Sequence, residues 1–120
     1  MGKFLVVDDE ESIRLSFSKH LESDGHDVVV ADNLSRCKDL LSERIFDAIF
    51  LDIIIGNENS IEHIKTLKSI QPSCSIILIT GLGVNQDYIV LSKRYGAQDY
   101  MVKPVYRHSL LYMAKKHATN

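Results

Sequence analysis

The stretch from Phe46 to Asp52 constrains the fold of this chain more than any other part of the sequence. It is about as long as one buried strand, is mostly apolar, has no turn-forming residue inside it, and ends on a carboxylate. In an open parallel sheet, ligands bind in the crevice beyond the carboxyl ends of the strands. The stretch therefore predicts that Asp52 lies at such an edge, within a binding site.

Three other short apolar runs also end on a polar side chain. They are Phe4–Val7 before Asp8 and Asp9, Ile76–Ile79 before Thr80, and Tyr100–Val102 before Lys103. Because the carboxyl ends of parallel strands meet at one edge, we expect these acids, the hydroxyl and the amine to gather around Asp52.

Five strand-like runs alternate with five segments of helical periodicity, which indicates a parallel sheet covered on both faces. Strands are expected at about 3–8, 27–31, 46–52, 76–80 and 99–102, and helices at about 11–23, 33–43, 60–70, 85–95 and 105–118. Residues 53–60 are predicted to form a loop. The expected fold is a single doubly wound, flavodoxin-like α/β domain over residues 1–120, with a five-stranded sheet in the order 2-1-3-4-5.

Composition narrows the classes of protein that remain. A chain of 120 residues can bury a core without disulfides, and a net charge of −2 gives no electrostatic reason to expect nucleic-acid or membrane binding. Cys37 and Cys74 lack the spacing of a zinc or redox motif, which favours reduced thiols. No secretion signal or membrane-spanning run is visible, so we expect a cytoplasmic protein.

Three carboxylates, those of Asp8, Asp9 and Asp52, are predicted to lie within a few ångström of each other. Ionised carboxylates that close repel one another, so the group favours a hard divalent cation with oxygen ligands, Mg²⁺ before Ca²⁺. Lys103 would add a fixed positive charge and Thr80 a hydroxyl donor. This arrangement suits phosphoryl transfer, in which a carboxylate can itself be the nucleophile.

Four segments resemble, in their order and spacing, the signature of the receiver domain of two-component response regulators. They are Lys3–Asp9, Leu51–Asp52, Ile79–Gly81 and Gly96–Pro104, and the match extends over essentially the full chain. The resemblance implies a phosphoprotein of two-component signal transduction. Such a protein is a switch that assists its own phosphorylation and dephosphorylation, and it is not an enzyme acting on a separate metabolite.

The resemblance also implies roles for the site residues. Asp52 matches the aspartate that takes a phosphoryl group from a sensor histidine kinase or a phosphotransfer protein. Asp9 would bind Mg²⁺, or Mn²⁺ in its place, directly, and Asp8 would act through a metal-bound water. Ile54 would offer its backbone carbonyl to the metal, beside the carboxylate of Asp52.

The remaining implied roles concern switching. Thr80 would hydrogen-bond the new phosphoryl oxygen, Lys103 would pair with it, and Tyr100 matches an aromatic residue that turns inward as Thr80 moves. A strand aromatic with a buried ring is the alternative interpretation of Tyr100. The fourth helix, fifth strand and fifth helix form the family's usual signalling face, which would contact a second copy or a downstream effector domain.

Two positions depart from the family pattern. Gly56 and Ser60 stand where the family usually has proline and glycine, which predicts a looser loop and a serine that adopts positive φ only at a cost. Two apolar residues, Ile54 and Leu82, would border the path of the water that attacks the phosphoryl group. They predict a long-lived phosphorylated state.

Three alternatives stay open on the sequence. A flavodoxin-like cofactor binder should carry a loop rich in Gly, Ser and Thr after its first strand, whereas residues 8–11 are all acidic. A phosphatase with an aspartate nucleophile should have a second acid shortly after it, and residues 53–55 are isoleucines. A receiver used only for protein contacts is disfavoured by the full set of site residues, but the altered loop keeps it open.

Overall fold

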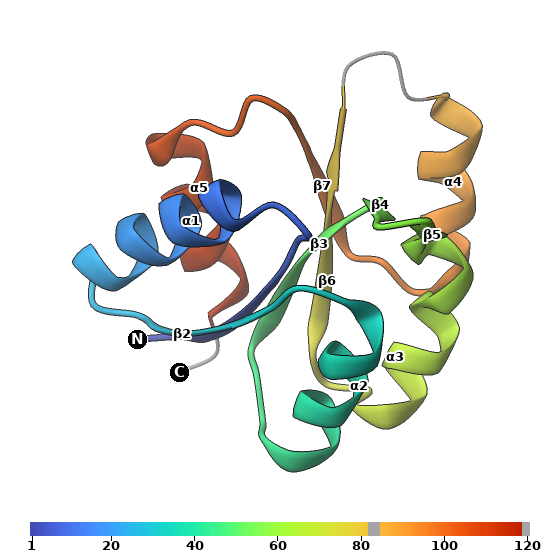
Figure 1. Ribbon diagram of the computed structural model, residues 1–120, viewed down its shortest axis with the longest axis horizontal. Coiled ribbons are helices and arrows are strands. Elements are labelled where there is room, and N and C mark those ends of the chain that lie inside the picture. The colour runs from blue at the N-terminus through green and yellow to red at the C-terminus, as the bar shows by residue number, and fades with distance from the viewer. Residues whose placement is uncertain (82–84, 119–120) are drawn as a thin grey trace.

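A five-stranded parallel sheet forms the centre of the protein in the computed structural model, which describes residues 1–81 and 85–118 (Figure 1). Its strands are β1 (Lys3–Val7), β2 (Asp27–Ala31), β3 (Ala48–Asp52), β6 (Ser75–Thr80) and β7 (Asp99–Val102). They lie in the order β2-β1-β3-β6-β7. Since β6 and β7 are the fourth and fifth strands of this sheet, the predicted fold class and strand order are confirmed.

Five α-helices cover both faces of the sheet (Figure 1). One face carries α1 (Glu11–Ser23) and α5 (Arg107–His117), and the other carries α2 (Leu34–Glu43), α3 (Ile64–Ile70) and α4 (Gln86–Tyr95). Within the described part of the chain, no helix has both the length and the hydrophobicity that crossing a bilayer requires.

The sheet divides the hydrophobic core into two layers, because successive side chains of a strand point to opposite faces. On β3, Ile49 and Leu51 pack in the layer that includes α2 and α3. Ala48 and Phe50 pack in the layer that includes α1 and α5. All four are at most 1% exposed, so β3 is buried on both faces, as its apolar sequence predicts.

Side-chain caps fix the starts of two helices. Asn33 caps α2, its side chain accepting from the Arg36 N–H at 2.7 Å, and Asn85 caps α4 by accepting from the Asp87 N–H at 2.8 Å. At the other end of α4, Gly96 adopts a left-handed φ of 119°.

The last helix begins later than predicted. Helix α5 starts at Arg107 rather than near Val105, and Tyr106 before it is extended. Val105 packs against the core layer of α1 and α5, so the chain stays extended until that side chain has reached the core.

Residues 54–59 form a hairpin where a loop is predicted. Strands β4 (Ile54–Ile55) and β5 (Glu58–Asn59) pair antiparallel, and the short 3₁₀ helix η1 (Ser60–His63) follows them. Gly56 has a φ of +62° in the two-residue turn, where a glycine costs little. We call residues 54–59 the β4–β5 hairpin.

The predicted backbone cost at Ser60 is wrong. Among the described residues, positive φ occurs only at glycines, and Ser60 is not one of these positions. Asn59 accepts from the Ile61 N–H at 3.0 Å and caps η1, so the turn is completed one residue before Ser60. A serine therefore fits where the family usually has glycine.

A buried glutamine anchors the segment that leads into β3. The Gln71 side chain accepts from the Phe46 N–H at 2.7 Å and donates to the carbonyl oxygens of Leu41 at 3.1 Å and Arg44 at 2.8 Å. These bonds satisfy backbone groups in the last turn of α2 and in the segment before β3. Gln71 thereby helps to fix the residue at which β3 begins, and hence the position of Asp52 at its end.

The two cysteines behave as expected from their spacing. Cys37 and Cys74 are free and buried. Burial raises the pKa of each thiol to about 12, so both remain protonated at neutral pH. They act as apolar members of the core.

Candidate functional site

Four strands of the sheet bring their carboxyl ends to one edge. Asp8 follows β1, Asp52 ends β3, Thr80 ends β6 and Lys103 follows β7. The Lys103 N–H donates to the Thr80 carbonyl at 2.7 Å, which holds the last two strand ends together. Asp8, Asp52, Thr80 and Lys103 therefore lie at the same edge of the sheet, as the sequence predicts.

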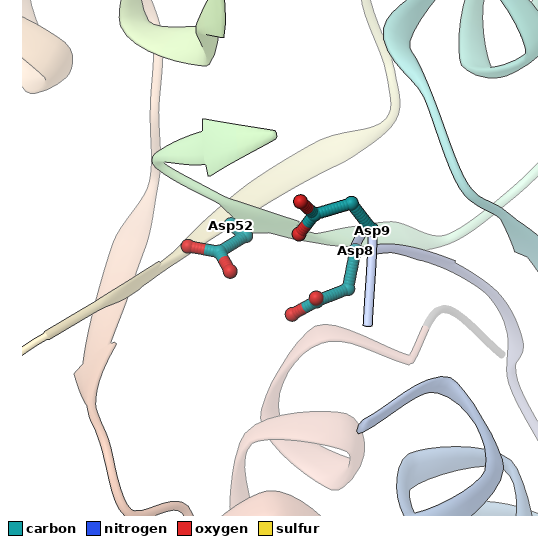
Figure 2. A group of neighbouring side chains, drawn as sticks. All are labelled: Asp8, Asp9 and Asp52. Carbon is teal, nitrogen blue, oxygen red and sulfur yellow. The ribbon is translucent and has the colours of Figure 1, made fainter. Parts of the chain in front are cut away.

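The three acids form one cluster (Figure 2). Asp8, Asp9 and Asp52 each have a carboxylate oxygen within 4.8 Å of those of the other two. Asp8 is 2% exposed and Asp52 is 7% exposed, whereas Asp9 is exposed at the mouth of the site. A surface depression of about 380 Å³ opens over them, and it is lined by Asp9, Glu10, Asp52, Ile53, Ile54, Gly81 and Lys103.

Lys103 supplies the positive charge of the site. Its Nζ lies 2.8 Å from Asp52 Oδ2 and 3.8 Å from Asp8 Oδ2. Partial burial alone would lower the pKa of Lys103, but its hydrogen bond and attraction to Asp52, together with the charge of Asp8, raise that pKa overall. Lys103 is therefore a fixed ammonium beside the Asp52 carboxylate.

Asp8 carries a destabilised negative charge. Burial, with the neighbouring Asp52 adding to it, raises the pKa of Asp8 from 3.8 to about 6. The Glu10 N–H, which donates to Asp8 Oδ1 at 2.9 Å, and the charge of Lys103 oppose this shift without cancelling it. The positive charge of Lys103 therefore does not offset the negative charge of the three carboxylates.

The cluster fits a hard divalent cation. All three donors are carboxylate oxygens, which Mg²⁺ and Ca²⁺ prefer, and the buried charge of Asp8 would be relieved by a bound cation. Asp8, Asp9 and Asp52 are the residues that could hold such a cation.

Three contacts of the site are not evident in the sequence. The Gly56 N–H donates to Asp9 Oδ2 at 3.1 Å, the Ser60 hydroxyl donates to the Asp52 carbonyl at 2.6 Å, and Arg14 Nη1 donates to the Asp8 carbonyl at 2.9 Å. The signal available for Gly56 and Ser60 was their departure from the family pattern, which indicated a changed loop but not these partners. Arg14 lies one turn into α1 and gives no such signal.

The two remaining predicted positions flank the site. Ile54 lies in β4 and is 55% exposed beside the depression. Tyr100 on β7 is half-buried, and Lys93 Nζ lies 5.7 Å from the centre of its ring, within range of a cation–π contact. Leu82, the other residue predicted to border the water path, lies outside the described residues.

Comparison with known proteins identifies the family. The sequence model of the response regulator receiver domain family matches residues 4–115. The chain belongs to this family of receiver domains, as the four sequence segments predict.

One similar protein is the alginate biosynthesis transcriptional regulatory protein AlgB of Pseudomonas putida. It is 32% identical over 103 residues, which is 86% of this chain and 23% of AlgB. The chain thus spans less than a quarter of the length of this relative.

Solved structures agree in fold. A CheY-like response regulator receiver domain protein of Methanospirillum hungatei has a TM-score of 0.90 at 26% identity, covering 97% of this chain and 92% of that one. A response regulator of Burkholderia pseudomallei, whose structure holds a phosphorylated aspartic acid, a calcium ion and citrate, has a TM-score of 0.87 at 28% identity. That match covers 95% of this chain and 66% of that one.

Proposed function

We propose that residues 1–120 act as a phosphoaccepting receiver domain in the cytoplasm, in which Asp52 takes a phosphoryl group from a sensor histidine kinase or a phosphotransfer protein. The observation that carries the proposal is the surroundings of Asp52. Its carboxylate lies 2.8 Å from the Lys103 ammonium and within the acidic cluster of Asp8 and Asp9. The domain is a phosphorylation-controlled switch, and it does not act on a separate metabolite.

The residues of the site divide the chemistry between them. A carboxylate oxygen of Asp52 attacks the phosphorus atom of the donor's phosphoryl group. The bond between that phosphorus and the donor breaks, the donor leaves with the bonding electrons, and an aspartyl phosphate forms. Lys103 and the Thr80 hydroxyl stabilise the charge on the phosphoryl oxygens. Asp8, Asp9, Asp52 and the Ile54 carbonyl would hold Mg²⁺, or Mn²⁺ in its place. When bound, the cation supplies further positive charge for those oxygens.

Phosphorylation would shift an existing equilibrium between two conformations of the domain. Thr80 and Tyr100 are the proposed switch residues, because Thr80 ends β6, the strand that pairs with β3 and its Asp52, and Tyr100 lies on the adjoining strand β7. Their movement would change the face formed by α4, β7 and α5.

That face is the proposed contact surface for a second copy or a downstream effector domain. A groove of about 620 Å³ runs along β7 and α5, and two of its aromatic side chains, Tyr106 and Tyr112, are 61% and 65% exposed. Exposed aromatic side chains of this kind are typical of protein interfaces. We propose no nucleic-acid or membrane contact for this domain itself.

Phosphorylation can be tested directly by mass. The protein is incubated with acetyl phosphate and Mg²⁺, and its intact mass is compared with that of a sample containing EDTA. We expect one added phosphoryl group only with the metal, and its removal by hydroxylamine, which cleaves acyl phosphates. A protein that binds Mg²⁺ yet gains no mass would refute phosphoacceptance and point to phosphorylation-independent binding.

The lifetime of the phosphorylated state depends on Ile54 in this scheme. An exposed isoleucine beside the depression hinders the approach of water to the phosphoryl group. We therefore expect Ile54→Asn to lose its phosphoryl group several-fold faster than the wild type, measured as decay of the adduct mass after donor removal. Ile45→Asn is the matched control, because Ile45 is 73% exposed and lies in the segment before β3, away from Asp52. Unchanged or slower decay in Ile54→Asn would contradict the prediction.

A further inference from the structure

The β4–β5 hairpin and η1 are attached to the site at two points. At the hairpin turn, the Gly56 N–H donates to Asp9 Oδ2 at 3.1 Å. Beyond the hairpin, the Ser60 hydroxyl donates to the Asp52 carbonyl at 2.6 Å, and the Ser60 N–H donates to the Ile53 carbonyl at 2.7 Å. The second attachment acts on the backbone of Asp52 itself.

The Asp52–Ile53 peptide group is held from both sides. Its oxygen accepts from Ser60, and its N–H, which belongs to Ile53, donates to the Ile79 carbonyl on β6 at 3.2 Å. The following peptide oxygen, that of Ile53, accepts from the Ser60 N–H. One residue thus provides two of the three hydrogen bonds that fix the chain immediately after Asp52.

The Ser60 hydroxyl is not readily replaced by solvent. Ser60 is 0% exposed, and a buried carbonyl that loses its donor becomes costly to the folded state. Without the hydroxyl, the Asp52–Ile53 peptide could rotate more freely, and the carboxylate attached to the same residue would move with it. Small misplacements of reacting groups slow reactions strongly, so this restraint has kinetic consequences.

We propose that Ser60 is a positioning residue for phosphoryl transfer, which holds the backbone of Asp52 so that its carboxylate stays aligned with Lys103. This inference rests on the proposed function of Asp52. It assigns a role to the serine that stands where the family usually has glycine. A glycine at this position would lack the hydroxyl and hence the contact with Asp52.

The test compares two variants that lack the hydroxyl. Ser60→Ala and Ser60→Gly differ in backbone freedom and packing but share the loss of the donor. Phosphorylation by acetyl phosphate is followed by intact mass at saturating Mg²⁺, and melting temperatures are measured in parallel. For both variants we expect the rate at saturating acetyl phosphate to fall by about tenfold. The half-saturating concentration of acetyl phosphate should change little.

Ser92 offers a matched control. It is 1% exposed, and its hydroxyl donates to a backbone carbonyl, that of Ile89, at 2.7 Å, but it lies in α4 and has no contact with Asp52. Ser92→Ala also removes a serine hydroxyl from a position that is as buried as Ser60. We expect it to keep the wild-type phosphorylation rate, whatever its effect on the melting temperature.

The outcomes separate this inference from the proposed function. If the wild type is phosphorylated and the folded Ser60 variants react at its rate, the positioning role is refuted and the proposed function stands. Equal slowing in Ser92→Ala would also refute it, because general loss of stability would then explain the effect. If the wild type gains no phosphoryl group, the proposed function fails and the role of Ser60 fails with it.

Discussion

Replacement of Asp52 by alanine is expected to abolish the metal-dependent phosphoryl adduct. The variant loses the carboxylate that lies 2.8 Å from Lys103, and with it the nucleophile of the proposed reaction. Asp8 and Asp9 remain, but neither of them lies that close to the Lys103 ammonium. Intact mass after incubation with acetyl phosphate and Mg²⁺ measures the loss, which should be complete.

Asp39→Ala is the control for this substitution. Asp39 is an exposed aspartate on α2, outside the acidic cluster, so its removal changes the net charge equally and should leave the adduct intact. An adduct of undiminished yield in Asp52→Ala would contradict the assignment. The acceptor would then have to be sought among the other acids of the site.

Asp8→Asn is expected to stabilise the protein in the absence of divalent cations. The substitution removes a buried carboxylate whose pKa is raised to about 6 by burial and by Asp52, while Lys103 keeps its closer partner Asp52. A pKa raised from 3.8 to about 6 corresponds to about 2–3 kcal/mol in the free energy of unfolding at neutral pH. Thermal unfolding with EDTA should therefore show a melting temperature higher by roughly 10 °C.

The pH dependence of this effect follows from the direction of the shift. Between about pH 4 and about pH 6, folded Asp8 holds a proton that the unfolded chain has released. The contribution of Asp8 to the free energy of unfolding therefore falls as the pH rises through this range, and the variant lacks this decline. The two proteins should have similar stability near pH 4 and differ most above about pH 6.

Added Mg²⁺ should reduce the difference in melting temperature between the wild type and Asp8→Asn, because the cation stabilises the folded state through the acidic cluster. The wild type should gain more in melting temperature than Asp8→Asn does. Asp39→Asn controls for the change in net charge and should follow the wild type at every pH. A variant that is no more stable than the wild type at neutral pH without metal would contradict the electrostatic account of Asp8.

The sequence predicts the sheet and the site edge because both follow from strong local patterns. Strand β3 is an uninterrupted buried strand, and its apolar run ends at Asp52. Each of the other polar side chains likewise follows or ends a strand, so a parallel sheet brings them together without any knowledge of the loops. The boundaries of α1, β2 and β7 also agree with the predicted ranges.

The contacts made by loops could not be predicted in the same way. The hairpin depends on the pairing of two-residue strands around Gly56, which is too short to produce a periodic pattern. Ser60 and Gln71 act through hydrogen bonds to backbone groups outside their own helices, and nearly every residue presents such groups. Propensity and periodicity carry no information on these partners, since tertiary packing alone selects them.

The division of the core by the sheet has a consequence for how this molecule can change over evolution. Substitutions in the layer beneath α1 and α5 are separated by the sheet from those beneath α2 and α3, and distant substitutions combine nearly additively. The α1–α5 side and the α2–α3 side of the domain can therefore diverge in sequence at different rates, without compensating substitutions on the opposite side. The strands of the sheet contribute side chains to both layers, so substitutions in the strands can affect both surfaces at once.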